Sequence, residues 1–130
     1  MKEITLSTSR GFLCRVELAD NLLTRGWGLL GRNRLGEDRG IWIRPCKSVH
    51  TFFMRFPLDL VYLSAGVTVV KTCSGIQPFQ FSLGGRQAYS VLELPDGFLA
   101  RKPLTAGETL VVGPVGYQAG ESSGSKPLLP

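Results

Sequence analysis

The stretch Gly40–Ser64, GIWIRPCKSVHTFFMRFPLDLVYLS, is the part around which we expect the rest of this chain to fold. Its apolar segments are too dense to remain in water, so we expect them to be central β-strands. An acid, Asp59, lies among them, and an unpaired buried charge costs several kcal/mol. We therefore expect Asp59 to pair with an arginine, namely Arg32, Arg44 or Arg55. The stretch is thus both core and candidate site.

Length and composition indicate one soluble globular domain. The chain has 130 residues, of which 43% are hydrophobic and 19% are charged. It contains no apolar run of about 18 residues, so we expect no membrane partner. The N-terminal segment MKEITLSTSRGFL has no apolar core of a secretory signal, so we expect a cytoplasmic location. Three widely spaced cysteines and one histidine predict reduced thiols, with no metal site and no cofactor.

The net charge of +5 comes from 15 Lys and Arg against 10 Asp and Glu. Several arginines cluster before the central stretch: Arg25, Arg32, Arg34, Arg39 and Arg44. Such a patch attracts phosphate, carboxylate or nucleic acid. Glu37 and Asp38 lie among these arginines, however, and this arrangement also fits an ordinary solvated surface with ion pairs.

Short apolar segments bounded by turn residues predict about eight strands. These are Lys2–Ser7 (an edge strand), Phe12–Leu18, Ile41–Ile43, Val49–Arg55, Leu58–Leu63, Val67–Cys73, Ala88–Leu94 and Leu110–Val112. Leu22–Leu30 has helical spacing after a capping Asp20 or Asn21 and predicts the one short α-helix. Ser74–Gln87 is expected to be a long loop, and Phe98–Ala100 a short extended piece.

These elements favour an all-β fold, an antiparallel β-sandwich or barrel with one short α-helix. Residues 1–116 form the single β domain in this interpretation. Residues 117–130 are rich in Gly, Ser and Pro, so we expect a disordered tail.

Several ordered blocks resemble the bacterial and archaeal domain-of-unknown-function family 192. The blocks are Gly28–Arg32 (GLLGR), Gly40–Ile43 (GIWI), His50–Asp59 (HTFFMRFPLD), Val91–Leu94 (VLEL), Gly97 and Gly107-Glu108. The similarity covers roughly Val16 to Val112. It implies a small, mainly β domain of sandwich type, of which this chain looks like a soluble variant. The family has no established activity, so the resemblance assigns no catalytic residue.

The residues that best suggest a functional site are His50, Arg55 and Asp59. His50 and Arg55 point to opposite faces of a regular strand, so the three groups meet only with a bulge. Our preferred interpretation of these charges is an internal ion pair that fixes the chain bend at Pro57, and a ligand-contacting role is the alternative. Two enzymatic alternatives stay open: a thiol nucleophile with Cys46 beside His50, and glycosidase-type chemistry with the carboxylates of Asp59 and Glu93.

The preferred hypothesis is a noncatalytic binding module for an anionic, partly apolar small molecule or peptide. The loop Ser74–Gln87 would close a cleft whose lining residues are Arg32, Trp42, Arg44, His50, Arg55 and Asp59. The alternative is a hydrolase-like enzyme that uses His50, Asp59 and nearby arginines. Nucleic acid is not expected as a partner, because the aromatic side chains are expected to be buried. We expect a monomer.

Overall fold

The structure is a computed structural model that describes residues 2–19, 37–50, 56–78 and 80–115. In these residues the chain forms nine strands and one short helix, which make a seven-stranded and a two-stranded sheet. In chain order the elements are β1 (Lys2–Thr8), β2 (Gly11–Ala19), β3 (Arg39–Ile43), β4 (Ser48–His50), β5 (Leu58–Leu63), β6 (Val69–Ile76), β7 (Phe81–Leu83), β8 (Ser90–Pro95), α2 (Phe98–Arg101) and β9 (Val111–Val115).

The large sheet has the strand order β6-β5-β8-β3-β2-β1-β9. It is mixed, because β2 and β3 run parallel while the other paired strands are antiparallel. A parallel pair needs a crossover of a dozen or more residues, and the chain between Ala19 and Arg39 has this length. The predicted antiparallel pairing therefore holds for every described strand pair except β2 with β3.

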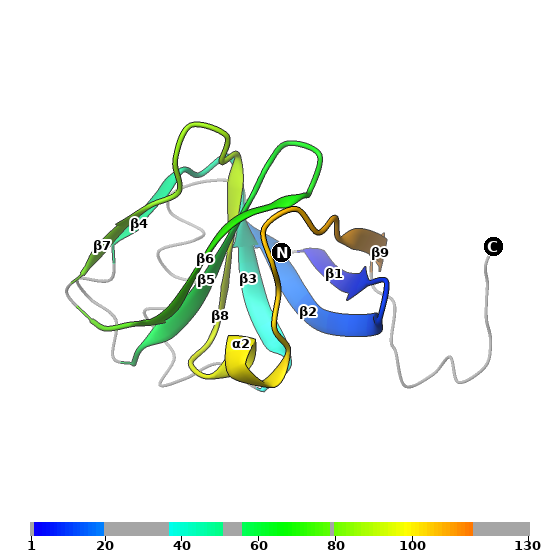
Figure 1. The fold of residues 1–130 in the computed structure, drawn as a ribbon. Coiled ribbons are helices and arrows are strands. Elements are labelled where there is room, and N and C mark those ends of the chain that lie inside the picture. Colours follow the sequence, from blue (N-terminus) through cyan, green and yellow to red (C-terminus); the bar gives the residue numbers. More distant parts are fainter. Residues whose placement is uncertain (1, 20–36, 51–55, 79, 116–130) are drawn as a thin grey trace.

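The sheet is strongly bent (Figure 1). One wing contains β1, β2 and β9, the other contains β5, β6 and β8, and β3 lies at the bend. Within the described residues β6 and β9 are the two edges, so the sheet is not a closed barrel. The prediction of a mainly β, sandwich-like fold is confirmed.

Two apolar clusters lie on opposite faces of the central strands. The first fills the space inside the bend and includes Leu6, Val61, Leu92 and Phe98. The second lies on the outer face of the wing formed by β5, β6 and β8, and it includes Tyr62. All six residues of β5 are buried, in agreement with the prediction that the central stretch supplies strands covered on both sides.

Three local predictions need correction. The strand expected at the edge, β1, lies between β2 and β9, because apolar alternation does not reveal a strand's second partner. The piece expected to be extended is α2, which follows Gly97 at a φ of 88°. The long loop expected over Ser74–Gln87 contains the end of β6 and all of β7.

Some predictions fall outside the described residues. These are the helix Leu22–Leu30, the strand Val49–Arg55 beyond His50, and the tail 117–130. In the part of the chain that the structure describes, no helix has both the length and the apolar character needed to cross a bilayer.

Candidate functional site

Asp59 is a buried carboxylate whose partners are backbone amides. Its side chain is 1% exposed and lies on β5, on the inner face of the bent sheet. One carboxylate oxygen accepts a hydrogen bond from the N–H of Gly75, and the other accepts one from the N–H of Leu99, both at 2.8 Å. The expectation that Asp59 is paired is met, but in the described residues its partners are peptide N–H groups rather than an arginine.

Local backbone geometry explains why these two amides are available. The pairing of β5 with β6 shifts between Leu58 and Leu60, which leaves an extra residue on β6 opposite Asp59. Gly75 lies in this bulge with a φ of 65°, a conformation that favours glycine. Leu99 lies in the first turn of α2, and the residue at the N-cap position before this helix, Gly97, has no side chain to cap it. Asp59 supplies the missing cap from another element.

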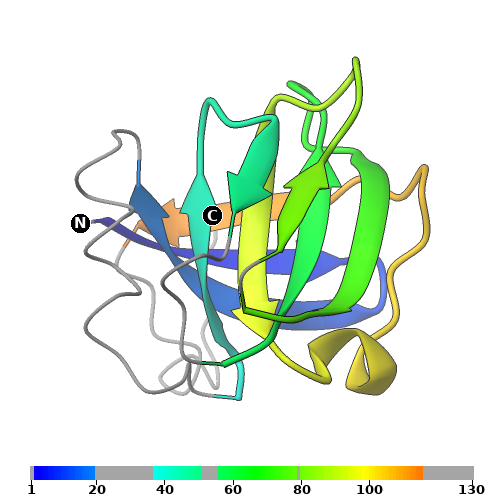
Figure 2. The same cartoon turned by 90° about the vertical axis from the view of Figure 1, so that its left-hand side faces the viewer.

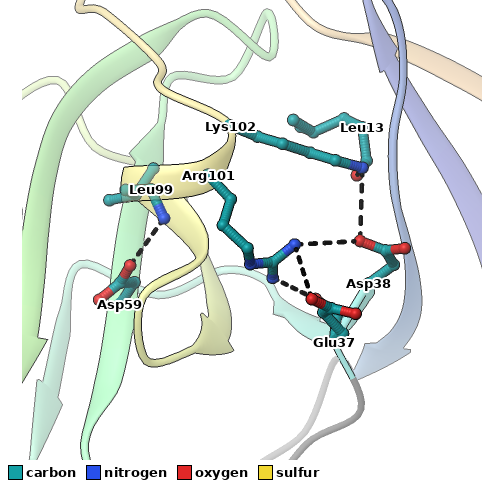
Figure 3. Close-up of polar contacts among 7 residues, drawn as sticks. All are labelled: Leu13, Glu37, Asp38, Asp59, Leu99, Arg101 and Lys102. Carbon is teal, nitrogen blue, oxygen red and sulfur yellow. Dashed lines mark hydrogen bonds and ion pairs between the residues drawn. The ribbon is translucent and has the colours of Figure 1, made fainter.

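The other side of α2 is joined to the opposite wing of the sheet (Figure 3). The Arg101 guanidinium lies 3.6 Å from carboxylate oxygens of Glu37 and of Asp38. The Lys102 ammonium donates to the carbonyl oxygen of Leu13 at 2.8 Å and lies 3.4 Å from Asp38. Together with the bond from Leu99 to Asp59, these contacts tie β5, β2 and the turn before β3 to one helix. Within the described residues, both carboxylate oxygens of Asp59 therefore hold backbone N–H groups in place, which is a structural role.

Two other predicted site residues, Trp42 and Arg44, contact each other. The indole of Trp42 is 3% exposed and donates its Nε1–H to Ser90 Oγ at 2.9 Å. The Arg44 guanidinium lies 5.2 Å from the centre of the Trp42 ring, a cation–π distance. Trp42 therefore contributes to the core, while Arg44 is partly exposed at its rim.

The structure gives little information on the remaining predicted site residues, Arg32, His50 and Arg55. Arg32 and Arg55 lie outside the described residues, and for His50 only the backbone is described, opposite Phe81. A ligand site built from them and Asp59 thus stays a prediction. Asp59 pairs with Leu94, whereas Glu93 pairs with the next β5 residue. The two carboxylates therefore lie on opposite faces of the sheet, and glycosidase-type chemistry between them is ruled out.

The thiol alternative places Cys46 next to β4. Cys46 is 7% exposed, and its Sγ–H donates to the carbonyl oxygen of Ser48 at 3.0 Å. A second thiol, Cys73, has its Sγ 3.7 Å from Ser82 Oγ. In the described part of the chain, no three His, Cys, Asp or Glu side chains gather in a group that could hold a metal ion.

The two-stranded sheet of β4 and β7, called the ribbon below, lies over the outer face of one wing (Figures 1 and 2). Its anchor is Tyr62, whose hydroxyl donates to Ser82, 3.1 Å from the carbonyl oxygen and 3.0 Å from Oγ. Burial raises the pKa of Tyr62, although the hydrogen bond with Ser82 opposes this shift. Gly84 follows β7 so closely over Tyr62 that a Cβ there would lie 2.4 Å from the ring.

Because Ser82 points inward to Tyr62, its neighbours on β7 point outward. Phe81 is 60% exposed and Leu83 is 58% exposed. Lys71 donates from Nζ to the carbonyl oxygen of Leu83 at 2.6 Å, which places an ammonium group beside this apolar pair. Lys47 adjoins the ribbon at its other strand, since its carbonyl oxygen accepts the N–H of Gly84 at 2.8 Å.

The exposed loop after β7 extends the same surface. Tyr89 is 43% exposed, and its carbonyl oxygen accepts the N–H of Cys46, next to Lys47, at 2.8 Å. Arg86 is exposed in the same loop. We call this region the ribbon surface; its side chains are Lys47, Lys71, Phe81, Leu83, Arg86 and Tyr89.

The ribbon surface belongs to a long segment with almost no acidic residues. Between Gly40 and Leu92 the only Asp or Glu is Asp59, which is buried. Glu93, the next acid along the chain, is also buried, at 5% exposure. Exposed basic groups on this side of the molecule therefore have no carboxylate from their own segment to neutralise them.

Sequence reasoning missed most of the ribbon surface, although a signal was present. The residues Phe81, Ser82 and Leu83 alternate with the period of a strand, and the segment without acids is visible in the sequence. Because apolar side chains are usually buried, this alternation predicts that Phe81 and Leu83 face the core. The Tyr62 hydroxyl reverses this orientation, because it needs a buried polar partner and Ser82 supplies one.

Fold and site together define a small, mainly β domain with a bent mixed sheet and an exposed apolar ribbon set among basic side chains. The chain belongs to the DUF192 family, described as "Uncharacterized ACR, COG1430", whose model matches residues 5–112. The resemblance found in the sequence is thereby confirmed. No functionally curated protein matches the chain at a significant level.

Two solved structures share the fold. One is a candidate transcription regulator from Sinorhizobium meliloti 1021, with 22% identity, a TM-score of 0.74, and coverage of 85% of this chain and 92% of that chain. The other is a protein of unknown function from Novosphingobium aromaticivorans DSM 12444, with 22% identity, a TM-score of 0.72, and coverage of 84% and 83%. At this identity the similarity concerns the fold alone.

Proposed function

We propose that this protein is a noncatalytic binding module that takes an anionic, partly apolar ligand on the ribbon surface. The observation that carries the proposal is the pair Phe81 and Leu83, more than half exposed, beside the ammonium group of Lys71. Water contact with two large apolar side chains is unfavourable, so covering them stabilises a complex. The surrounding cations select a ligand of negative charge.

The charge balance of the surface supports an anion rather than a neutral ligand. Lys47, Lys71 and Arg86 are exposed, and the acid that the same segment contains, Asp59, is buried on the inner face of the sheet. By contrast, Arg10 on the other wing has a carboxylate partner, since it pairs with Glu108 at 3.0 Å.

The contacts of the predicted catalytic groups favour binding over hydrolysis. Both oxygens of Asp59 already accept backbone N–H bonds, and the side chain is 1% exposed. A carboxylate in this position cannot reach a substrate unless α2 and the β6 bulge move away. A hydrolase-like activity through Asp59 would therefore require the core to open.

Calorimetric titration with hexyl phosphate tests the proposal, because this probe combines an anion with a short apolar chain. Inorganic phosphate and hexyltrimethylammonium are the comparison probes, since each lacks one of the two properties. We expect hexyl phosphate to bind more tightly than both. Equal binding of the hexyl cation, or no binding of hexyl phosphate, would contradict the proposal.

Two pairs of variants locate the binding. Leu83→Ser should weaken hexyl phosphate binding about fivefold through lost apolar contact, while Phe12→Ser changes an exposed residue of the other wing and should have no effect. Lys47→Gln should weaken it about threefold, while Arg10→Gln serves as the matched charge control.

A further inference from the structure

The ribbon surface has more positively charged side chains than one short anion can contact. Its cations are spread over three segments: Lys47 before β4, Lys71 on β6, and Arg86 in the loop after β7. One small anion is satisfied by one or two of them. A spread of positive charge without intervening carboxylates suits a partner that repeats its negative charge along a chain.

Hydrogen bonding at the ribbon argues against a partner that adds a β-strand. Strand addition needs free backbone groups along an edge. Three carbonyl oxygens of the ribbon are already occupied: that of Ser82 by the Tyr62 hydroxyl, that of Leu83 by Lys71, and that of Ser48 by the Cys46 thiol. Recognition must therefore come mainly from the outward side chains.

Two of these outward side chains are aromatic. Phe81 is 60% exposed on β7, and Tyr89 is 43% exposed in the loop before β8, where its carbonyl oxygen accepts the N–H of Cys46. Exposed rings beside Lys and Arg form a stacking platform for unpaired bases, while the cations follow the phosphates. The expectation that the aromatic residues are buried, which was the reason for not expecting nucleic acid, is met by Trp42 and Tyr62 but not by Phe81 and Tyr89.

From these observations we infer that the ligand of the ribbon surface is a single-stranded nucleic acid. The inference rests on the proposed function and specifies its ligand class. Phe81 stacks on one base, Leu83 packs beside it, and Lys47, Lys71 and Arg86 contact phosphates on either side. A duplex hides its base faces, so it can use only the cations and binds less tightly.

The decisive variant is Phe81→Leu, because it keeps an apolar side chain and removes the ring. Base stacking on one aromatic residue is worth enough that its loss should weaken binding at least about fivefold. The same substitution should leave hexyl phosphate binding nearly unchanged. Phe12→Leu, on the other wing, is the matched control and should affect neither ligand.

The experiment uses fluorescence anisotropy of the full chain with a labelled oligothymidylate of about 12 nucleotides, a length within the range of single-strand binding sites. We expect binding that weakens about 15-fold between about 50 mM and about 200 mM salt, as three phosphate contacts would give. We also expect weaker binding to the matching duplex and weak competition by oligoglutamate of the same length.

The binding results distinguish the nucleic-acid inference from the proposed function. Loss of binding in Phe81→Leu with the Phe12→Leu control intact supports the inference. Equal affinity for duplex, unchanged binding in Phe81→Leu, or equal competition by oligoglutamate overturns it. Hexyl phosphate binding without oligothymidylate binding overturns the nucleic acid and leaves the proposed function standing, and loss of both overturns the two together.

Discussion

Replacing Asp59 by alanine tests how the two wings of the sheet are held together. The substitution removes the acceptor of two backbone N–H groups, those of Gly75 and Leu99, and both lie at 2.8 Å from the carboxylate. A buried donor left without a partner costs about 1–3 kcal/mol. Removing the buried carboxylate also removes its desolvation cost, so we expect a net loss of roughly 3 kcal/mol in the free energy of unfolding.

Urea titration followed by tryptophan fluorescence measures this loss directly. For a domain of this size it should lower the urea midpoint by about 2 M. Hydrogen exchange gives a second readout, since the amides of Gly75 and Leu99 should lose more protection than those of central β5. Glu37→Ala removes an exposed partner of Arg101 at 3.6 Å and should cost less than about 0.5 kcal/mol.

Asp59→Asn refines the test because the amide keeps one acceptor oxygen. It should retain one of the two N–H bonds and place an NH₂ group against the other donor, so its loss should be substantial as well. A loss below about 1 kcal/mol for Asp59→Ala would refute the account of Asp59 as the cap of α2 and the partner of the β6 bulge.

Further predictions concern three other parts of the chain. Burial raises the pKa of the Cys14 thiol from 9.0 to about 12. Between these two pH values the folded state keeps the thiol proton while the unfolded chain loses it, so the free energy of unfolding falls as the pH rises. Urea titrations should show the wild type losing about 1.4 kcal/mol per pH unit relative to Cys14→Ala. Gly84→Ala should cost about 1–3 kcal/mol because its Cβ would overlap the Tyr62 ring, whereas Gly66→Ala, where the nearest atom is 3.9 Å away, should be nearly neutral in thermal unfolding. A chain that ends at Tyr117 should keep its melting temperature within a few degrees; a larger drop would show that the remaining residues dock on the domain.

The central strands were predictable from the sequence because their pattern has a direct physical cause. Leu58–Leu63 reads as a nearly continuous apolar segment, and such a strand is stable only when both of its faces are covered. The need of Asp59 for a partner followed from the same burial. The identity of that partner did not, because the amide of Leu99 lies 40 residues away in sequence and is brought close only by the fold.

The ribbon surface was hidden for a different reason. A short alternating segment does not indicate which of its faces is buried, and apolar side chains are normally assigned to the core. Here one buried hydroxyl, that of Tyr62, requires the serine of β7 as its partner and so turns Phe81 and Leu83 toward solvent. Only the distribution of charge, with no acid other than Asp59 between Gly40 and Leu92, indicated this face in advance.

Chemical-shift mapping with hexyl phosphate tests binding at the ribbon surface, because it reports the place of binding as well as its occurrence. We expect the shifted amides to gather at Lys47, Lys71 and residues 81–89, with none at α2 and none at Phe12. Shifts scattered over both wings, or confined to the surroundings of Arg101 and Lys102, would contradict it.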